Sequence, residues 1–159
     1  LEGEDEIVPI ERRIKEIDDL GLSYRMLLSS VAAAHAGFHL GHDHLAERVW
    51  RRGLELGAEM GHLWGAWILV EFGAWSAASR GDIESAARIW SAADEFGSQR
   101  GYGRWVSIVR AADERRERAR SADPDRYRAG MAAGKGLRLH DTVQSALGVA
   151  QGDTDRVSA

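Results

Sequence analysis

The chain has 159 residues, a net charge of −4 and no cysteine. The missing cysteines exclude disulfide bonds, thiolate metal ligands and cysteine nucleophiles, and the net negative charge argues mildly against direct nucleic-acid binding, which usually requires a basic face. No apolar run approaches the roughly 18 residues of a membrane span and no signal peptide is visible, so the sequence predicts a cytoplasmic protein without membrane contact.

The segments that can be assigned from this sequence are all helical. Runs rich in Ala, Leu, Glu and Arg, which favour helices, fill the chain between its two prolines, Pro9 and Pro124. No stretch alternates apolar and polar residues with β-branched enrichment, so strands are not expected. The first predicted element is an acidic amphipathic helix at 4–20 with isoleucine or leucine at helical spacing on one face. We expect it to cap the first repeat, with a remnant of a lost repeat as the alternative.

The next two segments, 23–61 and 62–101, are copies of one unit. The stretch AERVWRRGLELGAEMG (46–61) aligns without gaps on AARIWSAADEFGSQRG (86–101). Matching residues include Ala46 and Ala86, Arg48 and Arg88, Val49 and Ile89, Trp50 and Trp90, Gly57 and Gly97, and Gly61 and Gly101. Matching residues are 40 positions apart. This interval falls within the range of about 20 to 50 residues that is typical of stacked supersecondary units. The sequence therefore predicts a helical-repeat protein.

Each unit resolves into two helices joined by a short turn. The four helices are expected at about 23–40, 43–57, 62–79 and 83–97. Asp82 is a suitable N-cap for the last of them. Gly97 is predicted to end that helix in the left-handed conformation.

C-terminal to the repeats we expect three more helices, at 102–120, at 125–133 and from about Asp141, which is predicted to cap its helix. The stretch 110–128 holds seven arginines against five acids, which favours a solvated helix face over a phosphate-binding strip. The predicted organisation is one domain at 1–150, with a capping helix at 4–20, repeats at 23–61 and 62–101 and C-terminal helices at 102–150, followed by a flexible tail at 151–159.

Two segments resemble a known class of protein. RGDIESAARIWSAADEFG resembles a tetratricopeptide unit, with a Gly-Asp turn, Ala86 at a helix crossing and Trp90 as the aromatic residue, although the period of 40 exceeds the usual 34. A last repeat of this kind followed by a charged helix and RYRAGMAAGKGLRLHDTVQSALG is similar to the C-terminal end of bacterial transcriptional regulators of the LuxR and cyclase-associated ATPase type. The residues that carry the second similarity are Gly134, Leu137, Leu139, Asp141, Val143, Ala146 and Leu147.

The resemblance implies a right-handed superhelix of antiparallel helix pairs, with extra helices at both ends. It also implies that the chain is the regulatory end of a larger regulator or a stand-alone relative, and the chain begins at Leu1 and not at Met. The nucleotide-binding, cyclase and DNA-binding modules of such regulators have no counterpart in this sequence, because no GxxxxGK[ST] motif and no helix-turn-helix signature occurs.

The stretch HAGFHLGHDH (35–44) raises the question of a metal site. His35 and His39 are four residues apart and share a helical face, a spacing that can hold zinc or nickel, and His42 and His44 follow closely. In the second copy of the unit, the four histidines are replaced by Trp, Ser, Asp and Glu, so the repeat itself does not need them. We favour structural or exposed histidines and keep a metal site as the alternative, with no cofactor expected.

The tryptophans divide into two groups. Trp50 and Trp90 recur in register and are predicted to lie in the core. Trp64 and Trp67 lie on the first helix of a pair, and such helices line the concave face of repeat proteins, where aromatic side chains are typical binding anchors. Packing between repeats is the alternative for this second pair. We predict a partner-binding face made of Arg25, Trp64, Trp67 and Glu71.

The sequence thus predicts a noncatalytic interaction module for a protein or peptide partner, because repeat arrays present extended surfaces and no triad or carboxylate pair stands out. The alternatives are a sensor of a small molecule or metal and a self-association domain that forms homo-oligomers.

Overall fold

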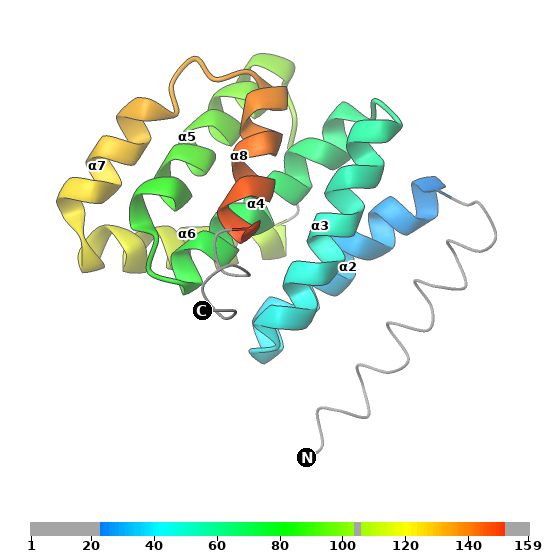
Figure 1. Cartoon of the computed structure of the whole chain (residues 1–159), viewed down its shortest axis with the longest axis horizontal. Helices are drawn as coiled ribbons and strands as arrows, with labels where there is room; N and C mark the ends of the chain where they lie inside the picture. Colours follow the sequence, from blue (N-terminus) through cyan, green and yellow to red (C-terminus); the bar gives the residue numbers. More distant parts are fainter. Residues whose placement is uncertain (1–22, 104–105, 152–159) are drawn as a thin grey trace. The chain divides into compact units, whose positions relative to one another are not determined.

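The structure is a computed structural model that describes residues 23–103 and 106–151 (Figure 1). Its helices are α2 (Ser23–Leu40), α3 (Asp43–Glu59), α4 (Leu63–Ser79), α5 (Ile83–Arg100), α6 (Val106–Ala122), α7 (Pro124–Ala133) and α8 (Leu139–Gln151). These residues contain no strand, which confirms the all-α prediction. The predicted helix at 4–20 and the tail from residue 152 onward lie outside the described residues.

The chain divides into two compact units, Leu1–Ala66 and Trp67–Ala159, and the boundary falls within α4. We refer to them as unit 1 and unit 2 and describe each by itself. The single domain at 1–150 stays a prediction.

A helix corner of one design recurs at equal intervals along the repeats. Its glycines are Gly41, Gly61, Gly81 and Gly101, with φ of +77°, +64°, +79° and +66°. The amide that follows each glycine donates to the carbonyl oxygen five residues before it. The four bonds are His42 to Gly37 (2.8 Å), His62 to Gly57 (2.8 Å), Asp82 to Ala77 (3.0 Å) and Tyr102 to Gly97 (2.9 Å). This bond, together with a left-handed glycine, is the Schellman ending of a helix. The backbone turn therefore recurs at half the 40-residue interval at which side-chain identities recur.

The predicted left-handed cap at Gly97 is wrong by one turn. The helix α5 continues to Arg100, and its left-handed C-cap is Gly101. Gly97 is helical and is needed for packing, because a Cβ there would lie 2.6 Å from Cζ2 of Trp67. The last helix also begins before Asp141, at Leu139, and Asp141 in its first turn pairs with Arg138, which precedes the helix. By contrast, Asp82 caps α5 as predicted, since its Oδ1 accepts the Ser85 amide at 3.2 Å.

Replacing Gly81 by Ala tests the corner design. The left-handed conformation disfavours any residue with a Cβ, so we expect the free energy of unfolding to fall by about 1 kcal/mol in urea titrations. A Cβ at Gly81 meets no atom within 4 Å, so steric overlap does not contribute. The exposed neighbour Ser79→Ala should change stability by less than about 0.5 kcal/mol. Equal stability of the Gly81 variant and the native chain would contradict the assignment of this corner.

In unit 1, small residues let successive helices approach closely. A Cβ on Gly37 of α2 would lie 2.9 Å from the Cβ of Ala46 on α3, and one on Gly57 of α3 would lie 3.3 Å from the amide nitrogen of Ala66 on α4. The helices α2 and α4 also meet, because a Cβ on Gly65 would lie 2.8 Å from Cγ of Leu27. The largest buried side chains of this unit are Met26, Leu27, Phe38, Trp50 and Leu54. Burial of Trp50 confirms its predicted core position.

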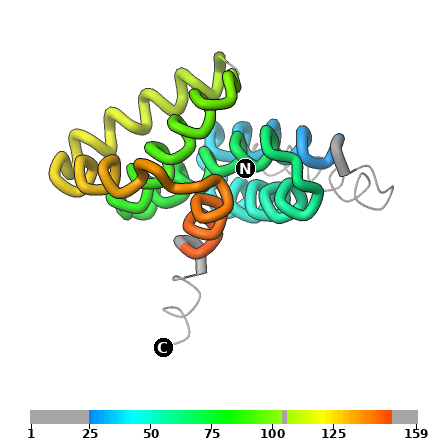
Figure 2. Tube along the Cα trace, turned by 90° about the horizontal axis from the view of Figure 1, so that it is seen from above, coloured from blue at the N-terminus to red at the C-terminus, as the bar shows by residue number. Residues whose placement is uncertain are grey.

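In unit 2, α4 and α5 are followed by a second pair, α6 and α7. The helix α7 packs on α5 (Figure 2), with Gly130 and Gly134 at the crossing. A Cβ on Gly130 would overlap the carbonyl oxygen of Glu84, so the two backbones are almost in contact. Ser91 of α5 adds a hydrogen bond to the Met131 carbonyl at 2.8 Å. The segment predicted as C-terminal additions thus contains a further helix pair.

The helix α8 packs on α5 through Leu139, Val143 and Ala146, which are buried and recur at helical spacing. The most apolar helix is α4, in which every residue from 65 to 77 is buried. Among the helices described, none has the length and apolar character required to cross a bilayer.

Candidate functional site

The candidate site is built on one face of α4, where Trp67, Glu71 and Trp75 recur at every fourth position. Glu71 is the only ionisable residue of this helix, and its relative exposure is 0%. A buried carboxylate without a partner would be very costly. The fold must therefore supply cations and hydrogen-bond donors to this side chain.

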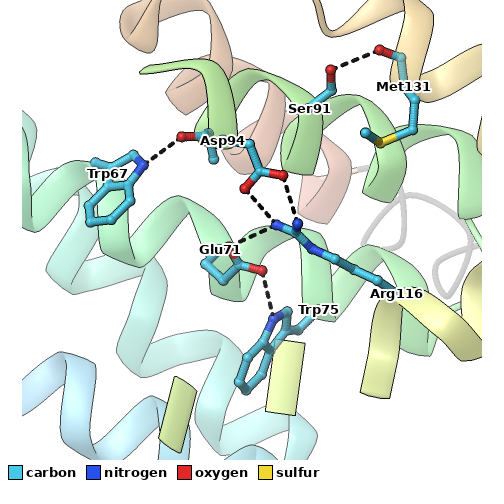
Figure 3. Close-up of polar contacts among 8 residues, drawn as sticks. Trp67, Glu71, Trp75, Ser91, Asp94, Arg116 and Met131 are labelled. Atoms are coloured by element: carbon cyan, nitrogen blue, oxygen red, sulfur yellow. Dashed lines mark hydrogen bonds and ion pairs between the residues drawn. The ribbon is translucent and has the colours of Figure 1, made fainter. Parts of the chain in front are cut away.

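Arg116 of α6 supplies the cation and connects three helices (Figure 3). Its Nη2 donates to Oε2 of Glu71 at 3.4 Å. Its Nη1 and Nη2 also donate to Oδ2 and Oδ1 of Asp94 on α5, at 2.7 and 3.0 Å. The second oxygen of Glu71, Oε1, accepts the indole N–H of Trp75 at 3.2 Å. We call these four residues, Glu71, Trp75, Asp94 and Arg116, the α4–α5–α6 clamp.

Aromatic rings lie close to the guanidinium groups of Arg116 and of its neighbour Arg115. Arg116 lies 5.4 Å from the ring centroid of Trp90, and its neighbour Arg115 lies 4.2 Å from that of Trp75. Tyr127 of α7 packs against Trp90, with ring centroids 6.4 Å apart. Stacking of a cation on an aromatic face is worth about 0.5–2 kcal/mol, with the larger values at desolvated sites. Trp90 is fully buried, which confirms its predicted core position.

The electrostatics of the clamp follow from burial and charge. Burial disfavours the charged guanidinium of Arg116, but the charge of Glu71 and the bonds to Asp94 outweigh it, so the pKa of Arg116 is raised above its ordinary value. Burial also raises the pKa of Tyr127, and the nearby Asp94 and Glu117 add to this while Arg116 and Arg120 oppose it. Arg116 is therefore a permanent cation held between two carboxylates. Such an arrangement joins helices.

Trp67 has a separate set of contacts at the α4–α5 pair. Its indole N–H donates to the Ala93 carbonyl at 2.6 Å, in the buried interior. Its ring lies against Gly97 and is 5.4 Å from Tyr102 between ring centroids. These contacts correspond to packing between helices, which was the alternative considered for this residue.

The four residues predicted to bind a partner are distributed over both units. Arg25 of α2 is exposed and Trp64 of α4 is half-buried, and both belong to unit 1. Trp67 and Glu71 are buried in unit 2, at 2% and 0% exposure, one helical turn apart. A substitution at either of these two would act first on stability. The binding role of the four residues stays a prediction.

The four clustered histidines lie at the end of α2 and the start of α3, in unit 1. The rings of His35 and His39 stack, with centroids 6.5 Å apart and planes inclined by 9°. His42 precedes α3 without a side-chain capping bond, and with His44 it lines an open hollow of about 560 Å³. In residues 23–103 and 106–151, no three histidine or carboxylate side chains are grouped so that they could hold a metal ion.

Trp75, Asp94 and Arg116 are the clamp residues that sequence analysis did not single out. The stretch around Arg116 was predicted to be a solvated face, and most of its arginines are exposed, but Arg116 has a side-chain exposure of only 17%. The signal was present in α4, where one glutamate interrupts an apolar helix and must find a cation. Which arginine meets it depends on how α6 crosses α4.

The paired charges of the α4–α5–α6 clamp, which lie among tryptophans, can cross-link helices and hold a surface in one shape. No family model, curated protein or solved structure matches this chain.

Proposed function

We propose that this chain is a noncatalytic, tetratricopeptide-like helical-repeat module that binds a protein or peptide partner. In the same proposal it acts in the cytoplasm as the regulatory end of a bacterial transcriptional regulator, which rests on the resemblance of 86–93 and 134–147 to such proteins.

The observation that carries the proposal is the glycine corner that recurs at equal intervals from Gly41 to Gly101. Corners at equal spacing give helices of nearly equal length, and alternate helices contact each other within each unit. In unit 1, α2 meets α4 at Leu27 and Gly65, and in unit 2, α4 meets α6 at Glu71 and Arg116. Stacked pairs of this kind produce right-handed superhelices in repeat proteins and present extended surfaces to partners.

The proposed binding face is the α2–α4 face of unit 1, with Arg25 and Trp64 as anchors. The contact between Leu27 and Gly65 brings their two helices together. Arg25 is exposed, and no carboxylate among the described residues pairs with it. Arginine and tryptophan are enriched among the residues that dominate binding energies. A noncatalytic role is supported by the clamp, whose charged groups are directed at one another.

Photocrosslinking in the source cells tests the proposal. A benzoylphenylalanine in place of Arg25 should crosslink to a defined protein, which mass spectrometry identifies. The same group at Arg118, an exposed position on α6, serves as the matched control. The purified partner should then bind Arg25→Ala and Trp64→Ala about tenfold more weakly than the native chain, as expected for anchors worth about 1–2 kcal/mol.

Three results would count against the proposal. Crosslinking from position 25 no stronger than from position 118 would remove the proposed face. A small molecule retained in native mass spectrometry would favour the sensor alternative. A dimer in light scattering that Arg25→Ala or Trp64→Ala dissociates would favour self-association. Urea titrations of both variants must accompany the binding data, because Trp64 is half-buried.

A further inference from the structure

A hollow of about 290 Å³ lies in unit 2, between the last turns of α5 and the loop that leads from α7 to α8. Figure 1 shows this loop between the two helices that it joins. One wall is formed by Glu95, Phe96, Gln99 and Arg100, and the other by residues 136–139. Ligand pockets commonly measure about 300–1,000 Å³. A hollow just below that range accommodates one or two side chains.

Hydrogen bonds within its walls hold this hollow in shape. The Gly136 amide donates to Oε2 of Glu95 at 2.8 Å, and Nε2 of Gln99 donates to Oε1 at 3.2 Å. Gly136 has a φ of +75°, which lets the loop turn its amide toward α5. Each oxygen of the Glu95 carboxylate therefore accepts one hydrogen bond from within the wall.

The rest of the lining combines an apolar wall with one uncommitted cation. Phe96 and Leu137 are half-buried and Leu139 is buried. Arg138 already forms a two-point pair with Asp141, at 3.0 and 3.3 Å. Arg100 differs, since its guanidinium carbon lies 5.2 Å from the Phe96 ring centroid and no carboxylate among the described residues pairs with it. Stacking on Phe96 positions this guanidinium while its N–H edge stays open to an anion.

We propose that this hollow binds a peptide segment of a partner in which an aliphatic residue and an acidic residue are neighbours. The aliphatic side chain packs on Phe96 and Leu137, and the carboxylate pairs with Arg100. A single guanidinium matches one carboxylate, whereas nucleic acid or an anionic membrane carries many negative charges and would meet the chain's net charge of −4. The hollow lies in unit 2 and the proposed α2–α4 face in unit 1, so the two proposals do not depend on each other.

Titration of the full ¹⁵N-labelled chain with acetyl-Leu-Asp-Gly-amide tests the site. We expect amide shifts at Phe96, Arg100 and 136–139 with a dissociation constant in the millimolar range. The isosteric acetyl-Leu-Asn-Gly-amide lacks the charge and should bind about threefold to fivefold more weakly, as for an exposed ion pair. Acetyl-Ala-Asp-Gly-amide lacks the aliphatic group and should bind about tenfold more weakly.

Two variants provide the matched control. Arg100→Gln should bind the Asp and Asn peptides equally, while Arg118→Gln, which removes an exposed charge from α6, should keep the preference for Asp. The proposal is overturned if the native chain shows no shifts at these residues, if both peptides bind it equally, or if Arg118→Gln also loses the preference. Each of these outcomes leaves the photocrosslinking test of Arg25 unaffected.

Discussion

Replacing Arg116 by Met is expected to lower the free energy of unfolding by about 3 kcal/mol, at the lower end of the range for breaking a buried ion pair. The variant keeps the aliphatic length of the side chain but leaves Glu71, with 0% exposure, without its cation. Asp94 loses its two-point bond as well, although its side chain is 36% exposed and water compensates in part. Urea titration followed by tryptophan fluorescence measures the change.

A double-mutant cycle separates the ion pair from other effects of this substitution. Glu71→Gln removes the buried charge, so Arg116→Met should cost at least about 1 kcal/mol less in that background. Arg118→Met, at an exposed position on the same helix, should change stability by less than about 0.5 kcal/mol. Equal costs of Arg116→Met in both backgrounds would show that Glu71 does not depend on this cation.

Replacing Gly130 by Ala is expected to destabilise unit 2 by about 2 kcal/mol. The added Cβ would overlap the Glu84 carbonyl oxygen and lie 2.8 Å from the Cβ of Ala87, so α7 would have to move away from α5. Backbone atoms cannot rotate aside as a flexible side chain can. The higher helix propensity of Ala offsets only about 0.5–1 kcal/mol of this cost.

Gly148→Ala is the matched control for this prediction. Gly148 is also helical and exposed, and a Cβ there meets no atom within 4 Å. We expect this substitution to leave stability unchanged or to raise it by up to about 1 kcal/mol. If Gly130→Ala has the same effect as Gly148→Ala in thermal and urea unfolding, α7 does not pack on α5 as closely as described.

Helix positions and corners could be predicted well because they depend on neighbours in sequence. Asp82 as a cap and the apolar stripes require only the residues within one or two turns. The side-chain repeat spans a helix pair, and not a single helix, because the side chains of alternate helices face different surroundings. Residues therefore match only every second helix, whereas the corners Gly41 and Gly61 have the same backbone geometry. Gly97 was predicted as the cap in place of Gly101 because the sequence does not show that Trp67, far away along the chain, packs against Gly97.

The histidine cluster illustrates the limit of spacing arguments. The spacing of His35 and His39 along the helix predicts one shared face, and the structure places the two rings in a stack on that face. Convergence of three ligands needs side chains from more than one direction, and the described residues do not supply it. Spacing along a helix determines direction but not the surroundings of a side chain.

By itself, the sequence determined the helical class, the repeated helix pairs and the burial of Trp50 and Trp90, because propensity, capping and apolar periodicity act over a short stretch of chain. Only the tertiary structure decided which arginine of a charged helix turns inward to Glu71, which lies far from it along the chain. It also decided that Trp67 is packed inside unit 2 and that Arg100 stands over Phe96 at a hollow closed by the loop between α7 and α8. These outcomes depend on the angle and distance at which helices cross, and no local rule specifies them.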